Sequence, residues 1–573
     1  MSTGSTRSRS HRAPGGPNLK RPTAGPARSD APVSQVKPTP EPPDEASPRL
    51  ASKGVAPPGA DRGTWTSGGR FFAVAAFVIL SVAAGLRLYE LALNPFHHDE
   101  GINGFFLTNL VREGTYTYDP ANYHGPTLYY FALVSETLFG LTTEAVRFVP
   151  AFFGVATVAL MLSLRRFIGP IAALTAAALL AVSPGAVYVS RYFIHESPLV
   201  FFSTAIVVSL LWYGDRRHPV FLILASASAA LLFATKETGI ISVMVLGIAA
   251  VVATRFVRLR GGNRPSSGKA GRAAGSGRSS KKHGGPPDRG RGWMEIPREV
   301  LVASGVVFLA IYVVFFSSFF ANYPKGLVDS LATFTIWTQT GTETQAQPVY
   351  AYLVWMLRAD APILILGTLG GLVAGWRGNN RLAVFVGLWA LGITAGYSII
   401  KYKTPWIALN MLVPLTILAG LAVTEIARSR QYRRLAPALL AGAMALNSYQ
   451  AVDLNFVHYD DETYPYVFVH TTRQALSLVN EIQRVATLAG TGDQTGVVFV
   501  TPDYWPLPWY FRNYPRAGFF GSIVPTQEAM IVANVNQEAE LEPSIAGKYR
   551  RVGVYNLRPG VDLVLYVRRD LAL

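Results

Sequence analysis

Long apolar stretches separated by short polar turns make up most of the central part of the chain. A membrane-spanning helix requires roughly 20 mostly apolar residues, and the sequence contains eleven such stretches. They cover residues 71–91, 147–164, 169–190, 198–214, 219–235, 238–256, 299–320, 360–377, 381–400, 405–425 and 435–452. The pattern predicts a polytopic α-helical membrane protein with about eleven transmembrane helices in residues 71–452.

Arginine clusters between these stretches indicate the side of the membrane on which each connection lies. Loops rich in Lys and Arg stay in the cytoplasm. If the N-terminus is cytoplasmic and 127–141 does not cross, all five clusters fall on the cytoplasmic side. The clusters are Arg165 with Arg166, Arg216 with Arg217, and residues 255–298, 377–381 and 428–434. We therefore expect an integral protein of the cell membrane with residues 453–573 outside.

The net charge of +17 is concentrated in two segments of low complexity. Residues 1–70 hold 11 Lys and Arg against 5 Asp and Glu, and residues 255–298 hold 12 against 2. Both segments are rich in Pro, Gly, Ser and Ala and too poor in large apolar residues to fold. We predict a disordered cytoplasmic tail over 1–70 and a disordered cytoplasmic loop over 257–298. They act either as solvated tethers or as contacts for membrane lipids, and they form no nucleic-acid-binding face.

The last 121 residues differ from the rest and predict a small extracytoplasmic α/β domain over 453–573. A helix is expected at 472–488 and a strand at 496–500, followed by paired strands at 551–557 and 561–567. Between them lies Thr-Pro-Asp-Tyr-Trp-Pro-Leu-Pro-Trp-Tyr-Phe-Arg, residues 501–512. Flat aromatic surfaces suit sugar rings and equally suit docking against the membrane domain, and the sequence favours neither.

Polar residues of the membrane part gather in the loops assigned to the outer side. Such residues at membrane depth are costly and are therefore candidates for function. The first outer loop (92–146) and its end supply His97, His98, Asp99, Glu100, His124 and Arg147, and later outer loops supply Arg191, His195, Glu196, Lys236, Glu237, Lys401, Tyr402, Lys403 and Trp406. Acids, imidazoles and cations on one membrane face predict a binding site for a phosphate-bearing lipid and a polar co-substrate.

The run His97-His98-Asp99-Glu100 is the strongest local signal in these loops. One carboxylate could act as general base, or the run could contribute to a divalent metal site. Because neighbours on a helix point in different directions, at most two of the four side chains share one target. The metal candidates are His98, Asp99 and Glu196. A chain without cysteine has no thiolate ligand and no disulfide.

Several of these residues also have a purely structural interpretation. The acidic run could be a solvated turn that leaves the first membrane helix. Lys401 and Lys403 could extend from the membrane interface into water, and Lys236 with Glu237 could be a charge pair at a helix end.

These residue types suit transfer of a sugar from a polyprenyl phosphate. Lys and Arg at the interface stabilise the phosphate that leaves, and a carboxylate such as Asp99 takes the proton of the acceptor hydroxyl. Direct displacement of the phosphate would invert the anomeric centre. The acceptor could be a protein, a lipid or a glycan.

The combined motifs resemble the GT-C membrane glycosyltransferases. Three motifs resemble those of the protein O-mannosyltransferase and aminoarabinose transferase branches (families 39 and 83). They are the acidic pair after the first membrane helix, Arg147-x-x-Pro150 and Glu196-Ser197-Pro198. Tyr-His-Gly-Pro at 123–126, Lys-Glu-Thr at 236–238 and Tyr-Lys-Thr-Pro-Trp at 402–406 resemble the flippase activity-associated glycosylation proteins.

The resemblance covers about residues 70–573 and implies a GT-C fold with Asp99 as catalytic base and Glu100 as its acidic neighbour. Two departures concern donor specificity and metal use. His124-Gly125-Pro126 stands where the family has a basic residue and two prolines, and Glu196 replaces an aspartate.

Two rival functions are a flippase for lipid-linked sugars and a non-catalytic accessory of envelope assembly. A flippase needs polar residues through the middle of several spans, whereas these spans are apolar and the charges gather at one face. An accessory would not need the intact Asp99 and Glu100. Both arguments favour the enzyme.

Overall fold

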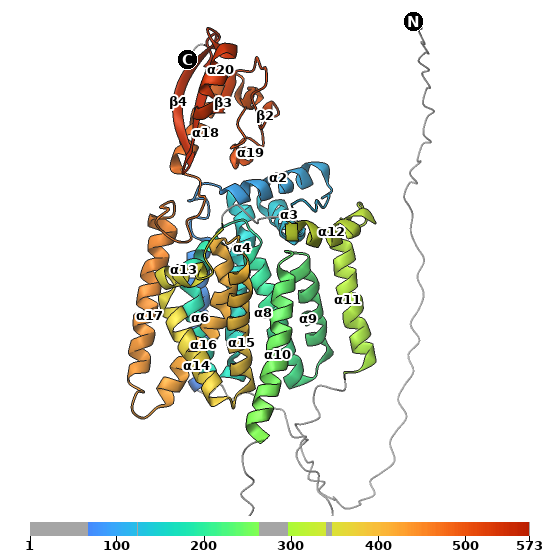
Figure 1. Cartoon of the computed structure of the whole chain (residues 1–573), viewed down its shortest axis with the longest axis vertical. Helices are drawn as coiled ribbons and strands as arrows, with labels where there is room; N and C mark the ends of the chain where they lie inside the picture. Colours follow the sequence, from blue (N-terminus) through green and yellow to red (C-terminus); the bar gives the residue numbers. More distant parts are fainter. Residues whose placement is uncertain (1–66, 123, 263–295, 340–345, 572–573) are drawn as a thin grey trace, which may run out of the picture. The chain divides into compact units, whose positions relative to one another are not determined.

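The structure is a computed structural model that describes residues 67–122, 124–262, 296–339 and 346–571. The predicted disordered segments 1–70 and 257–298 lie mostly outside the described residues. The described part is predominantly helical, with a small sheet near the C-terminus (Figure 1).

The elements follow one another along the chain as a long series of helices and then a mixed α/β segment. The membrane part contains α1 (Ser67–Leu88), α2 (His98–Glu113), α3 (Thr127–Phe139), α4 (Thr143–Ser163), α5 (Arg165–Ile168), α6 (Pro170–Ala181), α7 (Pro184–Ser190), α8 (Glu196–Arg216), α9 (Pro219–Phe233), α10 (Gly239–Gly262), α11 (Arg298–Phe316), α12 (Lys325–Gln339), α13 (Ala351–Ala359), α14 (Ala361–Arg377), α15 (Arg381–Ile399), α16 (Leu409–Arg428) and α17 (Leu435–Val452). The C-terminal part contains α18 (Arg473–Leu488), β1 (Val497–Phe499), α19 (Leu507–Tyr510), β2 (Ala517–Phe519), β3 (Met530–Asn534), α20 (Glu538–Ile545), β4 (Tyr549–Arg558) and β5 (Val561–Arg568).

Seven helices among the described residues are long and apolar enough to cross a membrane. These spans contain α1, α4, α8, α10, α11, α15 and α16. The pairs α6–α7 and α13–α14 meet the same criteria together but bend by 60° and 117°, which gives up to nine spans. The predicted count of eleven is therefore not confirmed, because α9 has only 15 residues and α17 is not among the spans.

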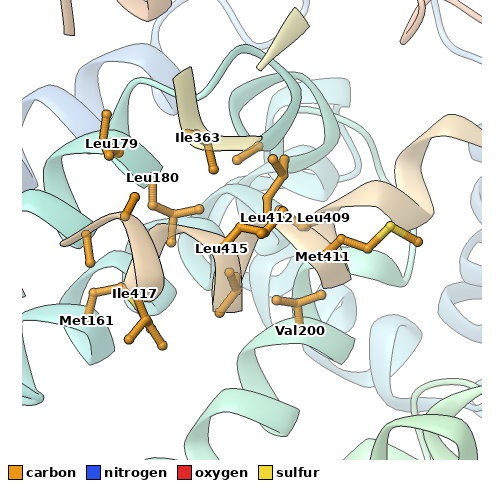
Figure 2. Close-up of a cluster of buried hydrophobic side chains, with 14 of the residues drawn as sticks. Met161, Leu179, Leu180, Val200, Ile363, Leu409, Met411, Leu412, Leu415 and Ile417 are labelled. Atoms are coloured by element: carbon orange, nitrogen blue, oxygen red, sulfur yellow. The ribbon is translucent and has the colours of Figure 1, made fainter. Parts of the chain in front are cut away.

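Helix α16 lies at the centre of the membrane core. Its apolar side chains lie among those of α4, α6, α8 and α14 (Figure 2), and they include Leu409, Met411, Leu412, Leu415 and Ile417. Because lipid is as apolar as these side chains, close packing holds such helices together rather than the hydrophobic effect.

The C-terminal part is a five-stranded sheet with the strand order β2-β1-β3-β5-β4. Strand β1 pairs in parallel with β2 and β3, and β5 pairs in antiparallel with β3 and β4. Apolar residues of α18 cover one face of the sheet, and those of α20 cover the other. The predicted helix and the three predicted strands correspond to α18, β1, β4 and β5, whereas the sequence pattern did not indicate β2, β3 and α20.

Candidate functional site

The acidic run begins helix α2, which lies across the end of the helical bundle that carries the α/β domain (Figure 1). His97 caps the helix, because its Nδ1 accepts a hydrogen bond from the backbone N–H of Asp99 at 3.1 Å. Asp99 and Glu100 follow in the first turn, where the helix dipole favours negative charge. The local sequence therefore places both carboxylates at one defined helix start.

Glu100 is fully buried and paired with Arg147 of α4. Arg147 Nε and Nη2 donate to the two carboxylate oxygens at 2.7 and 2.6 Å. The backbone N–H groups of His97 and Phe193 donate to the same carboxylate at 2.8 and 2.7 Å. Arg147 also donates to the carbonyls of Leu91, Asn94 and Pro95. The pair thus joins α2 and α4 to the loop that precedes α8.

Asp99 has a different environment although it is the next residue. Its side chain is partly exposed, and no described residue donates a hydrogen bond to its carboxylate. Because adjacent helix positions point about 100° apart, Asp99 does not share the buried position of Glu100. Of these two carboxylates, that of Asp99 is the more exposed.

His97 connects the start of α2 to two other segments. Its Nε2 lies 2.9 Å from the carbonyl oxygen of Phe468, in the segment that leads to the α/β domain. Its ring contacts Tyr192 at a centroid distance of 5.4 Å and Trp406 at 5.6 Å. The imidazole is buried in these contacts, which makes it a support for Asp99 rather than an open ligand.

A second charged cluster lies between α8 and the turn that precedes α10. Lys236 Nζ lies 2.6 Å from Glu196 Oε1, and both side chains are almost fully buried. Burial alone lowers the pKa of Lys236, but the carboxylates of Glu196 and Glu237 raise it above the usual value. His124 Nδ1 lies 3.0 Å from Glu237 Oε2, and the His124 ring packs on His195 at 4.8 Å.

Two polar side chains connect the clusters. Asn103 of α2 donates to the carbonyl oxygen of Phe193 at 2.9 Å and accepts a hydrogen bond from the Tyr129 hydroxyl at 2.9 Å. The Tyr129 ring contacts His195 edge-on at 5.6 Å. The sequence pattern did not indicate Asn103 or Tyr129, because neither residue type signals chemistry without a known neighbour.

The remaining predicted cations are held mainly by backbone carbonyls. Arg191 donates to the carbonyls of Leu86, Tyr89 and Glu90, at the end of α1. Lys403 is buried and donates to the carbonyls of Gln347 and Ile400. The adjacent side chains of Lys401 and Tyr402 are exposed. The backbone of Tyr402 pairs with that of Ala346.

The described residues contain no group of three His, Asp or Glu side chains that could hold a metal ion. The predicted metal set of His98, Asp99 and Glu196 is therefore not brought together in this structure. Glu196 instead neutralises the ammonium group of Lys236. No step of the chemistry proposed below uses a metal ion.

The aromatic run 501–512 docks against the membrane part. Trp509 is buried, stacks on Phe96 at 4.6 Å, and donates from Nε1 to Thr143 Oγ1 at 3.1 Å. Gly104 of α2 permits this approach, because a Cβ there would lie 2.7 Å from the Trp509 ring. Of the two interpretations left open by the sequence, docking is the one that Trp509 supports.

His98 lies beside this docking contact. Arg558 Nη1 lies 3.4 Å from His98 Nδ1 and 3.2 Å from the carbonyl oxygen of Trp505, and Arg558 also forms an ion pair with Asp503. Burial lowers the pKa of His98 from 6.5 to about 4, although the charge of Asp99 opposes the shift. His98 is therefore neutral at physiological pH, next to the arginine of the α/β domain.

Acidification is expected to destabilise the protein through His98. Between pH 6.5 and about 4 the unfolded chain binds the proton and the folded chain does not, so stability falls as the pH decreases. We expect His98→Gln to lose the part of this pH dependence that comes from His98, so that its Tm declines less steeply over that range. Thermal unfolding of the detergent-purified protein measures both profiles, and parallel profiles would contradict the assignment.

Comparisons with known proteins agree with this architecture. Residues 121–268 match the family of dolichyl-phosphate-mannose-protein mannosyltransferases. The structure of ArnT from Cupriavidus metallidurans bound to undecaprenyl phosphate is similar, with a TM-score of 0.59 and 17% identity over 89% of this chain and 100% of that chain. The chain therefore has the fold of ArnT, the fold type that its motifs predicted.

Further structures have the same fold at low sequence identity. The apo state of the same ArnT gives a TM-score of 0.58 at 16% identity, over 86% of this chain and 97% of that chain. The S. cerevisiae protein O-mannosyltransferase Pmt1-Pmt2 complex bound to the sugar donor gives 0.50 at 12% identity, over 72% and 92%. No curated protein sequence matches the chain significantly. The predicted GT-C fold class, a helical membrane part with a small C-terminal sheet domain, is confirmed.

Proposed function

We propose that this protein is a glycosyltransferase that transfers a sugar from a polyprenyl-phosphate donor to an acceptor hydroxyl on the extracytoplasmic side, with Asp99 as general base and inversion at the anomeric carbon. The observation that carries the proposal is the difference between two adjacent carboxylates. Glu100 is buried and bound on both oxygens, whereas Asp99 is partly exposed and accepts no hydrogen bond from the described residues. A general base needs a carboxylate that can reach the proton it removes.

A lipid phosphate is the donor group that the buried cation of Lys403 suits. Lys403 forms no ion pair with a carboxylate of the described residues, so its positive charge is not neutralised. Burial lowers the pKa of Lys403, and an anionic phosphate would offset that effect. The ArnT structure contains undecaprenyl phosphate and the yeast complex contains its sugar donor, which supports a donor of this class here.

The test is a transfer assay with the purified full-length protein and a panel of radiolabelled polyprenyl-phosphate sugars, in the presence of membrane acceptors. We expect label to move to an acceptor with at least one donor, and free polyprenyl phosphate to form in equal amount. Transbilayer movement of an intact donor in proteoliposomes, without transfer, would indicate the flippase alternative and contradict the proposal.

The proposed orientation can be tested with a single cysteine, because the chain has none of its own. Ser544 is an exposed residue of α20 in the α/β domain. We expect Ser544→Cys to react with a membrane-impermeant maleimide in intact cells. Labelling that requires permeabilised cells would place the α/β domain in the cytoplasm and contradict the orientation.

A further inference from the structure

A pocket of about 530 Å³ lies where α14 and α16 end and α15 begins, at one boundary of the membrane bundle. Asp360 directly precedes helix α14 and accepts a hydrogen bond from Tyr466 in the segment leading to the α/β domain. The 17 residues of α14 rise roughly 25 Å from there. The pocket is therefore on the opposite side of the bundle from the proposed catalytic site, at the end where α14 and α15 meet (Figure 1).

The rim of this pocket is positively charged. Arg377 and Arg428 both pair with Glu425, which holds the two guanidinium groups beside the opening. Arg381 lines the same pocket, is exposed and forms no ion pair with the described residues. The positive end of the α15 dipole adds to this potential. Three arginines against one glutamate leave a net charge of +2 on the rim.

The floor of the pocket is apolar and built from small residues. Helices α14 and α16 approach closely at Gly370, where a Cβ would lie 2.1 Å from the carbonyl oxygen of Leu418. Beyond this contact the helices present Val373, Ala374 and Ala422, whose side chains are too short to fill the space between the helix ends. A basic rim over an apolar floor at a membrane boundary is the arrangement that an anionic lipid requires.

We infer that this pocket binds the phosphate headgroup of an anionic phospholipid, with Arg381, Arg377 and Arg428 around the phosphate and the acyl chain region against Val373 and Ala374. The volume is within the range of small-molecule sites. Because arginine clusters stay in the cytoplasm, the ligand belongs to the cytoplasmic leaflet.

The test uses the full-length protein in phosphatidylcholine nanodiscs that contain a minor fraction of phosphatidylglycerol. Native mass spectrometry measures the phosphatidylglycerol that each protein retains. We expect the wild type to enrich this lipid and Arg381→Gln to lose about fivefold of the enrichment, since one arginine contributes about 1 kcal/mol near an anionic surface. The matched control is Arg433→Gln, which removes one exposed charge outside the pocket on the same face and should leave the enrichment unchanged.

Three outcomes would overturn the inference. One is equal enrichment by wild type and Arg381→Gln, and another is an equal loss in Arg433→Gln, which would show that surface charge alone attracts the lipid. The third is displacement of the lipid by glycerol phosphate at equal concentration, which would indicate a soluble anion site. Because binding is measured without a sugar donor, none of these results depends on the proposed catalytic function.

Discussion

Sugar transfer is expected to fall by about 10²- to 10⁴-fold when Asp99 is replaced by asparagine, the usual contribution of a general base. The substitution keeps the shape of the side chain but removes its capacity to accept a proton. Because no described residue donates to the Asp99 carboxylate, the fold loses no hydrogen bond. The turnover number in the donor assay should therefore decrease, while the KM for the donor and the Tm remain close to those of the wild type.

A control for this result is available on the same helix. Glu113 is an exposed acid at the end of α2, and Glu113→Gln changes the charge by the same amount without affecting the start of the helix. It should keep the transfer rate of the wild type. Unchanged turnover in Asp99→Asn, or an equal loss in Glu113→Gln, would exclude Asp99 as the base.

The substitution Glu100→Gln is expected to destabilise the protein by about 3–5 kcal/mol, as when one partner of a buried ion pair is removed. It leaves the guanidinium of Arg147 buried without a counter-charge. It also replaces one carboxylate oxygen by an amide nitrogen, so a donor such as the N–H of His97 or Phe193 loses its acceptor. Transfer activity should decrease together with stability.

Denaturant unfolding of the detergent-purified protein measures this effect. The matched control is Glu144→Gln, because Glu144 is an exposed glutamate in the first turn of α4, the same helix that carries Arg147. It should change the free energy of unfolding by less than about 0.5 kcal/mol. A Glu100→Gln variant as stable as the wild type would show that the buried pair does not hold α2 against α4.

Adjacent residues with the same chemistry show where prediction from the sequence ended. The pattern indicated that Asp99 and Glu100 matter, and on a helix they had to point in different directions. It did not indicate which carboxylate would be buried, because that depends on Arg147, 47 residues away. In the same way, Lys236 and Glu237 read as a local charge pair, whereas the structure pairs Lys236 with Glu196 and Glu237 with His124.

The sequence by itself determined the membrane class, the helical architecture of the central region and the segments in which the chemistry lies. These properties follow from local composition and periodicity. A run of about 20 apolar residues avoids water, and in a membrane it satisfies its backbone hydrogen bonds by forming a helix. Only the tertiary structure decided which acids pair with which cations, that the aromatic run containing Trp509 docks on α2, and that the ends of α14, α15 and α16 enclose a basic pocket. Those contacts join residues far apart along the chain, and their partners are selected by packing in three dimensions.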